Sequence, residues 1–139
     1  MAYDPDNIFA KIIRGEAPCV KVYEDDHTLA FMDVMPQADG HTLVVPKADA
    51  ESIFDLDVEM TACLMRTTQK VAKAVKKALD CEGLMLAQLN GRAAGQTVSH
   101  IHFHVIPRND GASLGLHGRS MADTKHLEAV AEKIRAALG

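Results

Sequence analysis

The feature that most constrains the fold is a short run in which three histidines, His100, His102 and His104, alternate with apolar residues. A period of two is the period of a β-strand, whose successive side chains point to opposite faces. The pattern therefore predicts a strand over residues 98–106. Its apolar face is expected in the core, and its other face is expected to present the three imidazoles together.

Periodicity elsewhere predicts short extended segments between helices. The expected elements are a helix at 8–13 ended by Gly15, strands at 20–23, 29–32, 41–45 and 84–89, a helix at 57–79 stopped by Gly83, and a C-terminal helix after Asp123. Because strands and helices occur in this order, we expect an α+β fold. It would consist of an antiparallel sheet of about five strands, one long central helix and a C-terminal helix.

Length and charge limit what the chain can be. A chain of 139 residues can bury one core, and no linker or repeat interrupts it, so we expect a single domain over 1–139. The formal net charge of -4 gives no general attraction to polyphosphate, which argues against nucleic acid as a partner. Acidic residues near the start and the lack of a long apolar segment favour a cytoplasmic protein without a membrane partner.

The histidine row leaves three chemistries open. Imidazole can act as a nucleophile, as a hydrogen-bonding group or as a metal ligand. In a regular strand, His100 and His104 would be roughly 13–14 Å apart, so one ion could hardly bind all three, although a two-histidine metal site survives this objection. The remaining alternative is a polar strand face without a function.

The loop before the row has the composition of a phosphate-binding loop. Its glycines allow backbone N–H groups to turn toward an anion, and neutral donors surround them: Asn90, Gln96, Thr97 and Ser99. Phosphoryl transfer needs positioning and donors aimed at developing charge. The loop and the three alternating histidines together therefore favour chemistry at a phosphate group.

Four blocks of the sequence resemble the histidine triad family in the family's order. The blocks are 8–16, 30–34, 40–47 and 94–108, and the last contains the signature in which three histidines alternate with apolar residues. The resemblance covers residues from about 6 to 108. Three histidines lie outside these blocks and are expected to be solvated: His27, His117 and His126.

The resemblance implies a role for each matching residue. His102 would be the nucleophile, His104 would contact the phosphate and assist the leaving group, and His100 and His41 would support the site. The nucleotide-binding residues would be Asp33 at the ribose, Phe9 and Phe31 around the base, and Asn90, Gly95, Gln96, Thr97 and Val98 at the phosphate. Core packing remains an alternative for Phe9, Phe31 and Val98, and turn capping for Asp33 and Asn90.

The resemblance also implies an activity. It is the hydrolysis of nucleoside phosphoramidates or related conjugates at the α-phosphate, through a nucleotidyl-histidine intermediate that releases a nucleoside monophosphate. The alternatives are a dinucleoside polyphosphate hydrolase, a non-catalytic nucleotide-binding signalling module, and a metal enzyme that uses two histidines. The expected substrate is a purine nucleotide, the expected assembly is a homodimer, and no cofactor is expected.

One departure from the resemblance concerns zinc. Many microbial members of the family bind zinc through a Cys-x-x-Cys pair, a further histidine and the first triad histidine. This chain has Asn7 and Ala10 at the pair and Asp49 near the third position, so we expect no metal. Cys19, Cys63 and Cys81 are widely spaced and are expected to be packing residues.

Overall fold

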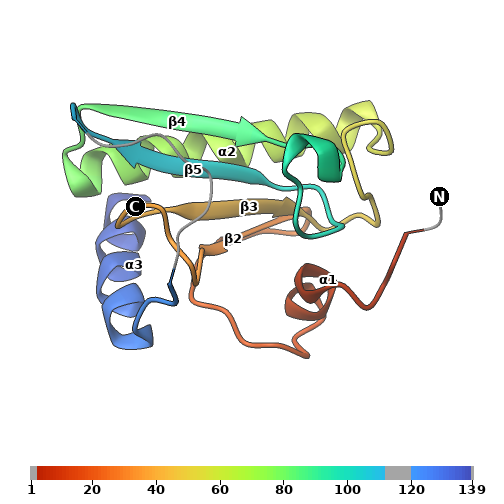
Figure 1. Ribbon diagram of the computed structural model, residues 1–139, viewed down its shortest axis with the longest axis horizontal. Coiled ribbons are helices and arrows are strands. Elements are labelled where there is room, and N and C mark those ends of the chain that lie inside the picture. Colours follow the sequence, from red (N-terminus) through yellow and green to blue (C-terminus); the bar gives the residue numbers. More distant parts are fainter. Residues whose placement is uncertain (1–2, 112–119, 139) are drawn as a thin grey trace.

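The structure is a computed structural model that describes residues 3–111 and 120–138. Its elements are α1 (Ile8–Ile13), β1 (Lys21–Glu24), β2 (Thr28–Met32), β3 (Thr42–Pro46), α2 (Val58–Leu79), β4 (Gly83–Gln88), the 3-10 helix η1 (Arg92–Ala94), β5 (Phe103–Arg108) and α3 (Thr124–Leu138). The five strands form one antiparallel sheet in the order β1-β2-β3-β5-β4 (Figure 1). The expected α+β architecture is confirmed.

Helices cover both faces of the central strands. Every residue of β2 and β3 is buried, so these strands have no solvent-facing side. Ala30 and Val44 join the main core with α2 and α3, whereas Phe31 and Leu43 join Phe9 of α1 in a second cluster. Figure 1 shows α1 lying apart from the two longer helices. A pocket lined by Phe9, Phe31 and Leu43 lies on the α1 side of the sheet.

The helix ends were predicted with mixed success. Gly15 follows α1 with a φ of +80°, as expected of a residue that stops a helix. The predicted end of α2 at Leu79 is confirmed, but Gly83 is not the residue that stops this helix, because it already belongs to β4. Asp80 makes the turn in the left-handed conformation, with a φ of 49°. Aspartate tolerates this conformation better than most residues with a side chain.

Strand β5 is shorter than predicted, because it begins at Phe103 and not at residue 98. The preceding segment uses its hydrogen-bonding groups elsewhere. The N–H of Ile101 donates to the carbonyl of Ala50 (2.9 Å). The ring of His100 lies 2.9 Å from the carbonyl oxygen of Pro46, the last residue of β3. Since these partners replace a strand ladder, the chain bends over residues 98–100.

Two further expectations concern membrane spans and the histidines outside the matching blocks. In residues 3–111 and 120–138, no helix is long and apolar enough to cross a membrane. His27 is exposed, and the exposed His126 lies 2.9 Å from Asp39, so both are solvated as expected. His117 lies outside the described residues.

Candidate functional site

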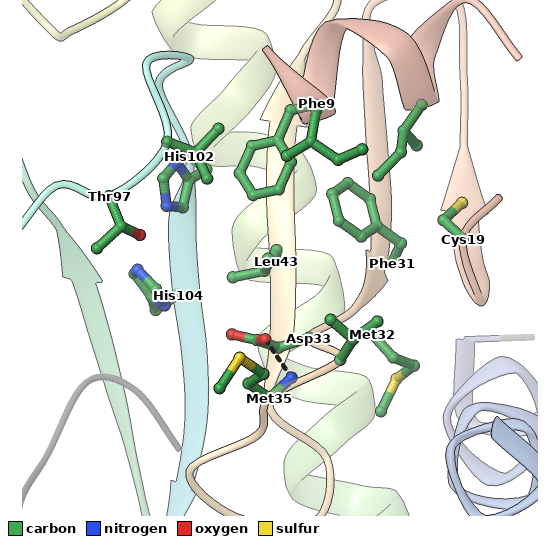
Figure 2. Close-up of a pocket in the computed structure, with 14 residues that line it drawn as sticks. Phe9, Cys19, Phe31, Met32, Asp33, Met35, Leu43, Thr97, His102 and His104 are labelled. Atoms are coloured by element: carbon green, nitrogen blue, oxygen red, sulfur yellow. Dashed lines mark hydrogen bonds between the residues drawn. The ribbon is translucent and has the colours of Figure 1, made fainter. Parts of the chain in front are cut away.

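A pocket of about 610 Å³ opens between α1, the end of β2 and the start of β5. Seven of the predicted site residues line it: Phe9, Phe31, Asp33, Thr97, Val98, His102 and His104. Figure 2 shows the two histidines and Thr97 along one side, with Phe9 and Phe31 across from them and Asp33 beyond Leu43. Apolar side chains with a few polar groups at one wall are typical of a small-molecule site.

Within the part of the chain that the structure describes, a backbone carbonyl orients His102. Its Nδ1 lies 2.7 Å from the carbonyl oxygen of His100. A carbonyl can only accept, so Nδ1 carries the proton and Nε2 keeps its lone pair in the neutral ring. The ring also meets the edge of Phe9, with centroids 4.8 Å apart and planes at 89°. His102 is only 4% exposed, so packing and hydrogen bonding fix its direction.

A second chain of contacts sets the proton arrangement of His104. The N–H of Gln37 donates to Nδ1 of His41 (2.9 Å), which leaves the proton of a neutral His41 on Nε2. That Nε2 lies 3.0 Å from Nδ1 of His104, which therefore accepts. A neutral His104 then carries its own proton on Nε2. His41 does not line the pocket but acts on it through His104.

The two pocket histidines thus have complementary states. Their ring centroids are 4.9 Å apart. His102 retains a lone pair on Nε2, whereas His104 holds a proton there. A nucleophile beside a proton donor is the arrangement that group transfer with a poor leaving group requires.

His100 does not join its two neighbours, contrary to the prediction that one strand face presents all three rings. Its ring turns away from the pocket, with Nε2 toward Pro46 and Nδ1 2.6 Å from the hydroxyl of Tyr3. Burial lowers the pKa of His100, which favours the neutral ring. His100 acts on the pocket through its backbone carbonyl, which orients His102.

Asp33 lines the pocket, and its side chain is 13% exposed. One carboxylate oxygen accepts a hydrogen bond from the N–H of Met35 (2.9 Å), drawn as the dashed line in Figure 2. The other oxygen lies 3.3 Å from Nε2 of His41. The carboxylate therefore caps a turn, and it is also one of the few polar groups that line the pocket.

The loop between β4 and β5 is built around the side chain of Gln96. Its oxygen accepts from the N–H of Gly91 (2.7 Å), and its nitrogen donates to the carbonyls of Glu51 (2.7 Å) and Val98 (2.9 Å). Gly91 and Gly95 have φ values of +89° and +101°, which glycine adopts readily. The side chain of Gln96 therefore holds the loop in shape and does not line the pocket.

Asn90 has a similar use at the start of this loop. Its side-chain oxygen accepts from the N–H of Ile53 (2.8 Å), and its amide exchanges hydrogen bonds with the amide of Gln88. Of the predicted phosphate-side residues, only Thr97 and Val98 line the pocket, whereas Asn90, Gly95 and Gln96 do not. The side chain of Asn90 joins its loop to Ile53, which lies 37 positions away, so the contact is a long-range one and not the cap of a local turn.

Sequence reasoning missed half of the pocket wall. The unpredicted lining residues are Ile8, Ile12, Cys19, Met32, Val34, Met35 and Leu43. Leu43 pairs with Phe31 across β2 and β3, so strand alternation could have placed it on the same face. Cys19 was predicted as a packing residue, and it also contributes to the wall. Ile8 and Ile12 carried no signal beyond the apolar face of a short helix.

Comparison with known proteins gives consistent matches over most of the chain. The family described as the HIT domain matches residues 14–111. The adenosine 5'-monophosphoramidase of Schizosaccharomyces pombe is 42% identical over 110 residues, which cover 78% of this chain and 80% of the relative.

Solved structures match over nearly the whole length. A Hit-like protein from Bartonella henselae, described as involved in cell-cycle regulation, is 50% identical with a TM-score of 0.92 and covers 99% of each chain. A zinc-bound histidine triad family protein from Mycobacterium smegmatis is 35% identical with a TM-score of 0.84, covering 96% of this chain and 93% of that one.

The side chains of this protein do not fit a zinc site of the kind expected from the resemblance. The side chain of Asn7 is buried and caps α1 by accepting from the N–H of Ala10 (2.8 Å), and Ala10 offers no ligand. Asp49 is exposed, and both ring nitrogens of His100 have partners. The group therefore offers no thiolate, and its single imidazole, that of His100, already has a hydrogen-bond partner at each nitrogen.

A second cluster has suitable residue types for a metal but unsuitable protonation. Ligand atoms of Asp33, His41 and His104 lie within 4.8 Å of one another. However, the N–H of Gln37 occupies the lone pair on Nδ1 of His41, so Nε2 is a donor and cannot also bind a cation. The cluster is arranged for hydrogen bonding.

Proposed function

Because the chain belongs to the HIT domain family, we propose that it is a nucleotide hydrolase that cleaves purine nucleoside phosphoramidates at the α-phosphate. The observation that supports this proposal best is the pairing of a lone pair on His102 with a proton on His104 at one pocket wall. The similarity to the fungal adenosine 5'-monophosphoramidase supports a phosphoramidate as the substrate of this protein rather than another conjugate.

In the first step, Nε2 of His102 attacks the α-phosphorus. A nitrogen–phosphorus bond forms to the ring, and the bond between phosphorus and the leaving amine breaks. The amine leaves with the electron pair of that bond and takes the proton from Nε2 of His104. Loss of this proton leaves His104 as an imidazolate, whose negative charge balances the positive charge of the nucleotidylated His102 ring. His41 stabilises this anion, because its own Nε2–H continues to donate to Nδ1 of His104.

In the second step, water hydrolyses the nucleotidyl-histidine. The water oxygen bonds to phosphorus, the bond from phosphorus to His102 breaks, and Nε2 of His104 takes a proton from the water. The products are a nucleoside monophosphate and the enzyme in its starting protonation state. Two easier displacements, the first by imidazole and the second by water, replace one difficult displacement.

The rest of the pocket suits a nucleoside monophosphate. Phe9 and Phe31 meet edge to face, with centroids 5.3 Å apart, and offer an apolar wall to a planar base. The carboxylate of Asp33 can accept hydrogen bonds from ribose hydroxyls. Thr97 and the glycine-rich loop stand on the side of His102, where the phosphate would bind.

Incubation with a substrate panel tests the proposal. The panel contains adenosine and guanosine phosphoramidates, an acyl adenylate and diadenosine polyphosphates, with product identification by mass. We expect the fastest release of monophosphate from the phosphoramidates and, after rapid quenching, nucleotide mass on the peptide that contains His102. Faster cleavage of a diadenosine polyphosphate would assign the protein to that activity. Binding without turnover would indicate a signalling module.

We also propose that the protein is a homodimer. Strand β4 is an edge of the sheet, and an unpaired edge with apolar side chains is a site for association. Leu86 on this strand is 44% exposed, and Phe54 and Val58 near the start of α2 are 83% and 80% exposed. Sedimentation at micromolar concentration should give a dimer, and Leu86→Lys should shift it toward the monomer. A fully active wild-type monomer would contradict this proposal.

A further inference from the structure

Tyr3 connects the start of the chain to the histidine segment without lining the pocket. Its hydroxyl lies 2.6 Å from Nδ1 of His100, and the two rings meet edge to face with centroids 5.7 Å apart. The amide of Asn7 donates to the same hydroxyl (2.9 Å). The cluster therefore joins α1, which carries the pocket wall, to the segment that leads into β5.

The direction of each hydrogen bond in this cluster follows from its partners. The carbonyl of Pro46 can only accept, so Nε2 of His100 carries a proton. In the neutral ring, Nδ1 then accepts, and the Tyr3 hydroxyl must be the donor. The amide of Asn7 supplies the hydrogen that the tyrosine oxygen accepts. In this series of hydrogen bonds, which runs from the amide of Asn7 through Tyr3 and His100 to the carbonyl of Pro46, every donor thus meets an acceptor.

Burial, hydrogen bonds and nearby charges shift the pKa values of His100 and Tyr3, and they do not all act in the same direction. Burial lowers the pKa of His100, whereas the hydrogen bond to Pro46 and the negative charge of Asp49 raise it. Burial also raises the pKa of Tyr3, with Asp49 and Asp4 acting in the same direction and Asn7 and Arg14 in the opposite one. The net shift of the pKa favours the neutral ring at both residues. A hydroxyl that donates to Nδ1 competes with a proton at that atom and so preserves the neutral His100.

The carbonyl of His100 is the group that orients His102, at 2.7 Å from its Nδ1. The ring of His100 is hydrogen-bonded at both nitrogens, so the peptide group of His100 has little freedom to move. We infer that Tyr3 is a positioning residue, which fixes His100 as the neutral Nε2–H tautomer and thereby aims Nε2 of His102 into the pocket. The kinetic part of this inference rests on the proposed function.

The sharpest test is Tyr3→Phe, because it removes one oxygen and keeps the ring contact with His100. Tyr23→Phe is the matched control, since it removes the other tyrosine hydroxyl of the chain, which donates to Asp25 (2.9 Å). With a phosphoramidate, we expect Tyr3→Phe to lower kcat by about tenfold with KM within about twofold, because misdirection of the nucleophile affects chemistry more than binding. The control should retain the wild-type values.

Nuclear magnetic resonance of the histidine rings supplies a readout that needs no substrate. Correlation spectra of the ring nitrogens separate the two neutral tautomers from the imidazolium. We expect His100 of the wild type to be the Nε2–H tautomer. In Tyr3→Phe, it should take up a proton at a higher pH, because its Nδ1 loses the competing donor while Asp49 remains. The ring signals of His102 should change with it.

A second variant redirects the hydroxyl without deleting it. Asn7→Asp keeps the oxygen that caps α1 at Ala10 and replaces the donating amide with a carboxylate oxygen. The tyrosine would then donate to this carboxylate and no longer to His100. We expect the same direction of change in kcat and in the titration of His100 as in Tyr3→Phe.

The outcomes that overturn the inference are distinct from failure of the proposed function. Wild-type kcat in Tyr3→Phe, or an equal loss in Tyr23→Phe, would show that the hydroxyl has no special role in positioning. Unchanged ring signals of His100 and His102 would show the same without any assay. If the wild type cleaves nothing in the substrate panel, the proposed function fails, and these spectra still decide the role of Tyr3.

Discussion

The backbone N–H of Gln37 donates to Nδ1 of His41, and this contact outside the pocket determines where His104 holds its proton inside it. The same principle applies at the other two histidines. The carbonyl of His100 sets the tautomer of His102, and the carbonyl of Pro46 sets that of His100. Backbone groups have a fixed role as donor or acceptor, so the fold itself dictates the protonation pattern.

The first prediction separates the two pocket histidines. Because His102 supplies the attacking lone pair, His102→Ala should lower kcat by about 10³-fold or more, which corresponds to ~4 kcal/mol of lost transition-state stabilisation. His104→Ala should retain more activity, since other donors share the contacts with the phosphate. Steady-state kinetics with a phosphoramidate will measure both.

Binding provides the control for this comparison. The apolar wall, Asp33 and the loop are intact in His102→Ala, so its Kd for a nucleoside monophosphate, measured by calorimetry, should stay within about threefold of wild type. Turnover by His102→Ala within about tenfold of wild type would contradict the assignment of the nucleophile.

A second prediction concerns Asp33 and the ribose. If its carboxylate accepts from the ribose hydroxyls, Asp33→Ala should weaken binding of a nucleoside monophosphate by about tenfold, the loss of charge-assisted hydrogen bonds. The matched ligand is the 2',3'-dideoxy monophosphate, which lacks both hydroxyls. It should bind to wild type and variant with similar Kd. An equal loss for both ligands would show that Asp33 acts only through its contacts to Met35 and His41.

The fold was predictable because hydrophobic periodicity and turn residues report on local structure. The long helix was placed to within one residue, since Leu64, Thr68, Val71 and Val75 are all buried on one face. The shortened strand β5 was not predictable in this way. The alternation of histidines and apolar residues begins at His100, but the pairing of β3 with β5 stops at Val44 and Phe103. Beyond that pair, the carbonyl of Pro46 meets the ring of His100 and not a strand N–H. Strand length depends on the neighbour, which local alternation cannot reveal.

The site was predictable for residues with reactive side chains and not for those that position them. His102 and His104 stand in a motif, whereas Tyr3 lies 97 positions from the ring that it contacts. Gln96 was correctly placed in the loop, but its side chain is used to join Gly91, Glu51 and Val98. Such contacts depend on how distant segments meet, so the sequence alone gave no signal for them.

A third prediction is that the purified protein contains no stoichiometric zinc. Asn7 caps a helix, Ala10 has no donor atom, and the two nitrogens of His100 are already engaged. Elemental analysis after dialysis without chelator should give well below one zinc per chain. Zinc that survives dialysis against a chelator at one per chain would contradict the prediction and point to the cluster of Asp33, His41 and His104.

A fourth prediction concerns stability in acid. Burial raises the pKa of Asp25, but hydrogen bonds from His27, Tyr23 and Thr28 outweigh it and lower the pKa from 3.8 to about 2. The folded state therefore favours the carboxylate. The resulting stability is present above pH 3.8 and is lost as the pH falls toward 2. Because the group is largely solvated, we expect a contribution of only about 1 kcal/mol.

Asp25→Asn provides the measurement for this contribution. Urea unfolding of wild type and variant should differ by about 1 kcal/mol near pH 6, and the difference should shrink as the pH approaches 2. A difference that is independent of pH would mean that the hydrogen bonds, and not the charge, stabilise the turn between β1 and β2.

A fifth prediction concerns Gly40, the residue before His41. Its φ of +94° lies in the region that favours glycine, and a Cβ built there would be 2.2 Å from Cδ1 of Leu79 and 3.1 Å from Cγ of Pro107. Gly40→Ala must therefore strain the backbone and also move the side chain of Leu79, with the ring of Pro107 close by. We expect a loss of about 2–3 kcal/mol in the free energy of unfolding, which combines the two costs.

Gly15→Ala isolates the backbone part of that loss. Gly15 has a similar φ of +80°, but a Cβ there would meet nothing within 4 Å. This control should lose only about 1 kcal/mol. Leu79→Ala combined with Gly40→Ala should recover part of the steric cost, so the two changes should be less than additive. If urea unfolding shows equal losses for Gly40→Ala and Gly15→Ala, the contact with Leu79 does not constrain the turn that carries His41.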